Sequence, residues 1–261
     1  MKQLRLLALF FKLGTMSEME YRANFFIHAW EAIMILATGV SVLWVVFSQT
    51  KKIDGWTFNE LLMVLGIYFF FYGMINMTIS PSMKRFMKDV WNGDLDYILT
   101  KPENHQLMAS ARQVVIWSLA EVLIGVGIMI TSLYRLRAAI GVSQALMFLV
   151  AVGAGGIVIY SFWLVIGTLS FWTTKIENLL LVFYSMYEAG RWPVGMYPFW
   201  LKYSLVFVVP VALAVTVPAE AIIGRLSWSI AGICVGIAIP QYLFARWFFH
   251  YGLRRYSGAS A

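Results

Sequence analysis

Four carboxylates stand inside or beside long apolar segments of this chain: Glu31, Glu121, Glu188 and Glu220. If such a segment crosses a membrane, a charge at its centre costs about 2.5 to 3.5 kcal/mol, so the side chain normally faces a partner or a cavity. Arg191 follows Glu188 by three residues, on one helical face, and we expect the two to form an ion pair. A proton relay would need a chain of such groups, and these are scattered. We take Glu121, Glu188 and Arg191 as candidate intramembrane polar residues and disfavour proton coupling.

Other kinds of chemistry find no support in the sequence. The three histidines, His28, His105 and His250, lie in unrelated segments without metal-ligand spacing. The single cysteine, Cys234, excludes an internal disulfide. GxSxG, HExxH and GxxxxGK motifs do not occur. The sequence therefore predicts no catalytic residue and no metal or cofactor bound by this chain, and any chemistry of ATP and Mg must take place on another polypeptide.

The composition is that of a membrane protein. Hydrophobic residues make up 61% of the chain and charged residues 13%, with a mean hydropathy of +0.74, whereas soluble domains carry about 25% charged residues. The net charge of +7 comes mostly from Lys and Arg that flank apolar segments, where they meet lipid head groups. We therefore expect membrane lipids as partners, no nucleic acid, and one membrane domain over residues 1–261.

Apolar runs of about 20 residues predict membrane-spanning helices. The clear runs are Phe25–Phe47, Leu61–Ile79, Val114–Leu133, Gly141–Trp172 and Leu226–Phe249. We also expect an interfacial amphipathic helix within residues 1–22, because Leu6, Leu9, Phe10 and Leu13 recur at helical spacing. The predicted fold is an all-α polytopic membrane protein.

A region from Leu179 to Gly224 is apolar but repeatedly interrupted by proline. Since proline breaks helices, we expect one crossing from Leu179 to Tyr197 and then a re-entrant helical hairpin over residues 198–224, with its turn near Pro210. Irregular backbone at membrane depth is tolerated only where protein or a watery cavity covers it. This region completes a prediction of six transmembrane helices with the hairpin before the last one.

The distribution of basic residues predicts the orientation. Six crossings put both termini on one side, which then holds Lys2, Arg5, Lys12, Arg22, Lys84, Arg85, Lys88, Lys101, Arg112, Lys175, Arg246, Arg254 and Arg255. The opposite side holds fewer: Lys51, Lys52, Arg135, Arg137, Lys202 and Arg225. The excess of Lys and Arg indicates cytoplasmic termini.

One long charged segment, residues 80–105, separates the second and third predicted spans. Within it Met83, Phe86, Met87 and Val90 recur at helical spacing, while Lys84, Arg85, Lys88 and Asp89 fill the other face. We therefore expect a short amphipathic helix outside the membrane, whose apolar face needs a cover from lipid or another protein. Asn92-Gly93 then predicts a turn before Asp94-Leu95-Asp96.

This turn resembles a signature of bacterial ABC type-2 family permeases, G-E/D-L-D-x-x-L-x-K-P, which follows their second span. The residues that match are Gly93, Asp94, Leu95, Asp96, Leu99, Lys101 and Pro102. Further similar segments are Tyr21-Arg22, Tyr197-Pro198-x-Trp200-Leu201 and the run from Gly252 to Ser257.

The resemblance implies the six-span membrane half of an ABC exporter, which works as a dimer of permeases and is powered by separate ATPase subunits. The loop after span two would supply a coupling helix that contacts the ATPase, with residues 83–90 and 93–102 as the contact. The N-terminal helix would flank it. The segment 198–224 would close the outer end of the pathway, which makes Pro198, Trp200, Pro210 and Pro218 candidate gate residues.

The expected function is therefore that of a permease in the cell (plasma or inner) membrane, exporting a lipophilic or amphipathic solute. The second permease copy could be identical or a paralogue. A flippase or importer of the same architecture remains an alternative, as does a membrane scaffold or lipid-modifying protein without transport.

Overall fold

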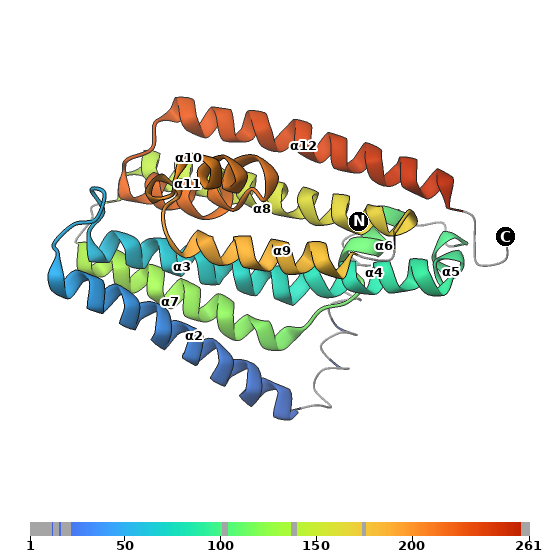
Figure 1. Cartoon of the computed structure of the whole chain (residues 1–261), viewed down its shortest axis with the longest axis horizontal. Helices are drawn as coiled ribbons and strands as arrows, with labels where there is room; N and C mark the ends of the chain where they lie inside the picture. The colour runs from blue at the N-terminus through green and yellow to red at the C-terminus, as the bar shows by residue number, and fades with distance from the viewer. Residues whose placement is uncertain are drawn as a thin grey trace.

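The computed structural model describes residues 12, 16, 22–100, 104–136, 140–173 and 176–256. The predicted N-terminal interfacial helix, apart from Lys12, Met16 and Arg22, lies outside these residues, as do Lys101 and Pro102 of the signature. The described chain is a bundle of helices (Figure 1), and its extended pairing is limited to one isolated bridge between Ile53 and Trp56. The predicted all-α class is confirmed.

The order of helices follows the apolar runs of the sequence. The α-helices are α2 (Arg22–Gln49), α3 (Phe58–Met74), α4 (Ser80–Asn92), α5 (Leu95–Leu99), α6 (His105–Ala111), α7 (Leu119–Leu136), α8 (Val142–Thr168), α9 (Glu177–Glu188), α10 (Phe199–Tyr203), α11 (Val211–Ile223) and α12 (Trp228–Arg255). The described residues also form the π-helical turns η1 (Ile75–Ile79) and η6 (Ser204–Val208). Short 3-10 turns are η2 (Ile116–Ser118), η3 (Leu169–Phe171), η4 (Ala189–Arg191) and η5 (Val194–Met196).

Within the described residues, five helical segments are long and apolar enough to cross a membrane. They are Ala29–Gln49, Phe58–Asn92, Ile116–Leu136, Val142–Phe171 and Trp228–Arg255. A bent pair, Phe199–Val208 with Val211–Ile223, makes six if it counts as one span. These findings confirm the polytopic prediction.

The predicted fifth span, Leu179–Tyr197, is wrong in length. Helix α9 has 12 residues and ends at Glu188, where the chain tightens into η4 and then η5. At 1.5 Å per residue α9 is about 18 Å long, short of the roughly 30 Å hydrocarbon core. Gly190 and Pro193 in the turns after α9 account for the early end, because neither residue favours a continued helix.

The expected separation of the charged-segment helix from the second span is also wrong. Helices α3, η1 and α4 form one uninterrupted segment of 35 residues, Phe58–Asn92, which we call the α3–α4 rod. Pro81 cannot donate to the carbonyl of Met77, four residues before it. Instead the backbone N–H of Val115 donates to that oxygen at 2.9 Å. The π-helical turn and the hydrogen bond from Val115 therefore allow the rod to remain helical through Pro81.

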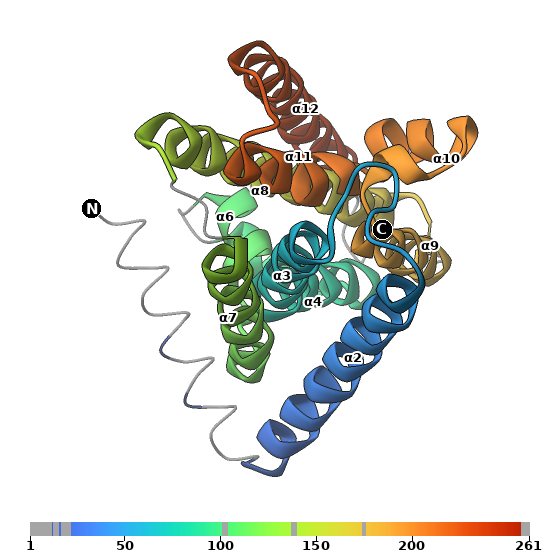
Figure 2. The same cartoon turned by 90° about the vertical axis from the view of Figure 1, so that its left-hand side faces the viewer.

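The rod lies at the centre of the bundle when viewed along the molecule (Figure 2), with α2, α7, α8 and α9 around it. It packs along α7 with unusually close backbones. A Cβ at Gly125 would lie 2.5 Å from the Phe70 nitrogen, and one at Gly73 would lie 2.7 Å from the Val122 nitrogen. Small residues therefore set this helix pairing, as is common in membranes.

The second half of the bundle is built on α8, which packs against α11 and α12. Among the glycines of α8, Gly155 makes the closest approach, since a Cβ there would lie 2.6 Å from the Ala214 Cα, whereas Gly153 has nothing within 4 Å. The chain bends by 98° between η6 and α11. The break falls at Val209 and Pro210, which confirms the predicted turn near Pro210. The two arms, Phe199–Val208 and Val211–Ile223, meet at an open angle and do not fold back as a closed hairpin, and we call this bent pair the elbow.

Candidate functional site

The apolar stripe of α4 is covered by the chain itself. Met83 is fully buried, Phe86 and Met87 are each 2% exposed and Val90 is 9% exposed. The Phe86 ring lies 5.7 Å from Phe171 and 5.6 Å from Phe249, measured between centroids. The expectation that lipid or another protein covers this face is therefore wrong, because the unbroken rod keeps the stripe aligned with α8 and α12.

The polar side of α4 carries one buried acid among exposed bases. Asp89 is 2% exposed, and it accepts hydrogen bonds from Arg85 Nε at 3.1 Å and from Arg112 Nη1 at 2.7 Å. Ser82 Oγ donates to the Gln113 carbonyl at 2.8 Å and accepts from its N–H at 3.2 Å. These bonds tie residues 112–113 to α4. The sequence placed Asp89 on a solvated face, and no local signal marked the long-range partner.

The Gly93 turn ends the rod and exposes a small acidic surface. Gly93 has φ of 80°, and its N–H donates to the Val90 carbonyl at 3.4 Å. Leu95 is buried beside α4, whereas Asp94, Asp96 and Tyr97 are exposed, Tyr97 by 76%. The signature thus combines a helix-ending glycine, an anchoring leucine and three exposed side chains.

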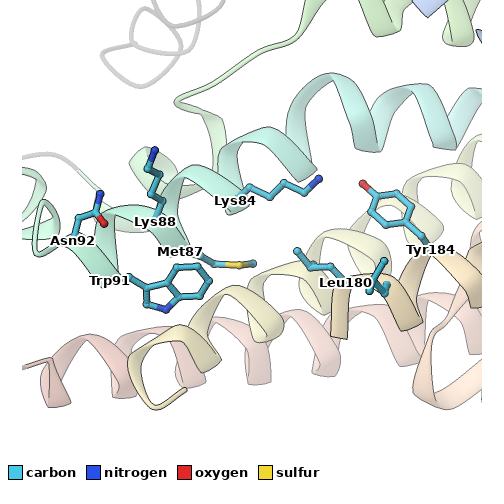
Figure 3. Close-up of a pocket in the computed structure, with 8 residues that line it drawn as sticks. Lys84, Met87, Lys88, Trp91, Asn92, Leu180 and Tyr184 are labelled. Atoms are coloured by element: carbon cyan, nitrogen blue, oxygen red, sulfur yellow. The ribbon is translucent and has the colours of Figure 1, made fainter. Parts of the chain in front are cut away.

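A groove of about 760 Å³ runs between α4 and α9; we call it the α4–α9 groove. Lys84 points along it toward Tyr184, and Met87 extends toward Leu180 (Figure 3). Its lining residues are Lys84, Met87, Lys88, Trp91, Asn92, Leu180, Leu181 and Tyr184. The sequence did not reveal this groove, because its two walls are separated by most of the chain's middle third.

A second, polar cavity of about 500 Å³ adjoins the groove, since Lys84 and Tyr184 line both. It takes polar groups from α2, the α3–α4 rod, α7 and α9, among them Glu31, Tyr72, Asn76, Ser80, Glu121 and Tyr184. The Tyr184 hydroxyl lies 2.9 Å from Ser80 Oγ and 3.1 Å from Asn76 Oδ1. We call this space the polar cavity.

The three candidate intramembrane polar residues lie in two places. Glu121 is 4% exposed at the polar cavity, and its Oε2 is buried without a hydrogen-bond partner. Glu188 and Arg191 form the predicted ion pair at 3.5 Å, with Glu188 largely exposed. The Arg191 guanidinium also lies 5.3 Å from the Tyr68 ring centroid. The structure does not bring this pair together with Glu121 at one cavity.

The candidate gate residues are spread along the elbow. Pro198 precedes α10 as its N-cap, and Trp200 is 68% exposed on α10. Pro210 stands at the break, and Pro218 is buried inside α11. Next to Trp200, the rings of Phe199 and Tyr203 lie 4.3 Å apart. The elbow therefore presents an exposed aromatic surface on α10 and buries its other arm against α8.

An ion pair that the sequence did not predict closes the opposite end of the bundle. Arg225 donates to Glu60 Oε1 at 2.6 Å and to the Gly55 carbonyl at 2.9 Å, and its guanidinium lies 4.6 Å from the Trp56 ring centroid. Among the described residues no group of three or more His, Cys, Asp or Glu could hold a metal ion.

Comparison with known proteins gave a family match that covers the rod, the Gly93 turn and the elbow. Residues 33–260, most of the chain, match the family described as "ABC-2 family transporter protein". Neither the curated proteins nor the solved structures gave a match. This family contains the membrane subunits of ABC transporters, which associate with ABC ATPase subunits. The chain belongs to the ABC-2 family of transporter proteins, as a multi-pass permease subunit.

Proposed function

We propose that this permease exports a lipophilic or amphipathic solute across the cell (inner) membrane. It works with a second permease copy, and separate ATPase subunits hold the ATP and Mg. The observation that supports this most is the α3–α4 rod, one helical segment of 35 residues that ends in the Gly93 turn. Because a continuous helix is stiff along its axis, displacement of the turn reaches the centre of the bundle.

The ATPase contact is narrower than the whole charged segment. Met83, Phe86, Met87, Val90 and Leu95 are buried, so they anchor the rod and the turn. The contact is left to exposed groups, namely Lys84, Lys88, Asp94, Asp96 and Tyr97. Lys101 and Pro102, which follow in the sequence, complete the proposed surface.

The outer faces of the bundle support contact with lipid. Exposed large apolar side chains occur on α2 and on α12, including Phe26, Trp30, Trp44, Ile233, Leu243 and Trp247. A protein that kept such surfaces in water would aggregate. We place the Gly93 turn and both termini in the cytoplasm, as the excess of Lys and Arg on that side predicts.

The elbow formed by α10 and α11 is proposed as the gate at the outer end of the pathway. The aromatic surface at Trp200 and Tyr203 and the break at Pro210 support this role. The bend at Pro210 lets α10 move while α11 stays packed on α8.

Co-purification of the permease with its ATPase tests the coupling surface. The triple variant Asp94→Ala, Asp96→Ala, Tyr97→Ala should lose the ATPase, because all three side chains are exposed at the end of the rod. A control pair at the opposite end, Lys51→Ala and Lys52→Ala, should keep it. Normal retention of the ATPase by the triple variant would refute the proposed contact.

A further inference from the structure

Glu121 presents a buried carboxylate oxygen to a cavity, with no group of the described chain bonded to it. The side chain belongs to α7, is 4% exposed and lines the polar cavity, while its Oε2 has no hydrogen-bond partner. Burying an ionised carboxylate is costly when one of its oxygen atoms has no hydrogen-bond partner. Such a group is stabilised by a cation that enters the cavity.

The other groups of the polar cavity suit an organic ammonium ion. Glu31 contributes a second carboxylate, and Asn76 and Ser80 contribute further oxygen atoms. Tyr72 and Tyr184 contribute aromatic rings, whose faces attract cations. The Lys84 ammonium, which lines both spaces, lies 5.7 Å from the Tyr184 ring centroid, so a ligand ammonium is placed at Glu121 and Tyr72.

The adjoining α4–α9 groove supplies a place for an apolar body. Its walls include Met87, Trp91, Leu180 and Leu181, and it shares Tyr184 with the polar cavity. Because the two spaces share Lys84 and Tyr184, a molecule with an ammonium head and an apolar or aromatic body can place its head in the polar cavity and its body in the groove that Figure 3 draws.

We infer that the polar cavity and the α4–α9 groove form one binding site for amphipathic amines, with the ammonium at Glu121 and the apolar body along Trp91. That the bound amine is the transported solute rests on the function proposed above. The binding of the amine to the permease does not depend on that proposed function, and this binding can be measured without an ATPase.

Two matched probes test the site on the full chain in discs of zwitterionic lipid. Dansylcadaverine carries a primary ammonium on an apolar fluorophore, and its N-acetyl derivative keeps the fluorophore without the charge. The unmodified chain should bind the amine at least tenfold more tightly than the acetylated probe. The variant Glu121→Gln should remove that preference and leave the affinity for the acetylated probe unchanged.

Further variants separate the head from the body of the probe. Trp91→Ala should weaken both probes alike, because it removes groove wall and no charge. Asp54→Asn, at an exposed turn at the other end of the bundle, removes the same charge as Glu121→Gln and should bind both probes normally. If Glu121→Gln does not fold, as judged by gel filtration, Glu31→Gln should show the same loss of preference.

Equal binding of the two probes by the unmodified chain would overturn the inference, as would normal amine preference in both carboxylate variants. The ATPase co-purification experiment gives an independent result. A chain that holds its ATPase but does not prefer the amine leaves the proposed export function standing and removes this site.

Discussion

Gly125 of α7 lets this helix pack closely against α3, because glycine has no Cβ. A Cβ at this position would meet the Phe70 nitrogen at 2.5 Å and the Gly66 oxygen at 2.7 Å. Both are backbone atoms, so they cannot move aside as the end of a flexible side chain could. The pairing of α3 with α7 therefore depends on this residue.

The variant Gly125→Ala should lower stability by about 1 to 3 kcal/mol, the usual cost of overpacking a core. The measurement is thermal unfolding of the purified chain in detergent. Gly127→Ala is the matched control on the same helix, because a Cβ there has nothing within 4 Å. Equal melting temperatures for the two variants would contradict the close helix contact.

Asp89 is a second residue whose partners are distant in sequence. Its buried carboxylate accepts from Arg85 and Arg112, both of which stay partly in water. Asp89→Asn should lower the free energy of unfolding by about 1.5 to 3 kcal/mol, the range for hydrogen bonds to charged groups. It should also weaken the packing of α6 against α4. Faster amide hydrogen exchange over residues 105–115 would show this loosening. The exposed Lys88→Gln change should leave exchange there as it is.

Among the elements, the α3–α4 rod departs most from expectation. The amphipathic spacing of Met83 to Val90 correctly predicted a helix. The continuity through η1 was not predictable, because it depends on the Val115 N–H, which reaches Met77 from a segment beyond the loop. The residues around Pro81 alone cannot predict a hydrogen-bond donor that the tertiary fold brings from another segment.

Gly93 ends the rod in a left-handed conformation, φ of 80°, that most side chains avoid. Asn tolerates this conformation far better than a β-branched residue. We expect Gly93→Asn to keep the ATPase in co-purification and Gly93→Val to lose it, because valine would redirect α5. Equal retention of the ATPase by both variants would show that the angle of the turn does not matter for coupling.

At the scale of the whole molecule, the Gly93 turn and the loop before α3 lie at opposite ends of the long axis (Figure 1). If the proposed orientation is correct, Tyr97→Cys should react with an impermeant thiol reagent only from the cytoplasm. Lys52→Cys should react only from outside. Both are exposed positions, and Cys234→Ala provides a background without other thiols. Reversed labelling would invert the orientation and reject the cytoplasmic coupling surface.

The sequence by itself determined the membrane class, the main apolar spans, the break near Pro210 and the pairing of Glu188 with Arg191. Each of these depends on composition or on residues close together in the chain. Tertiary structure decided the cover of the α4 stripe, the partners of Asp89, and the meeting of Glu121, Lys84 and Tyr184 at adjoining cavities. Such features depend on which helices become neighbours, and close backbone contact at glycines such as Gly125 selects those neighbours.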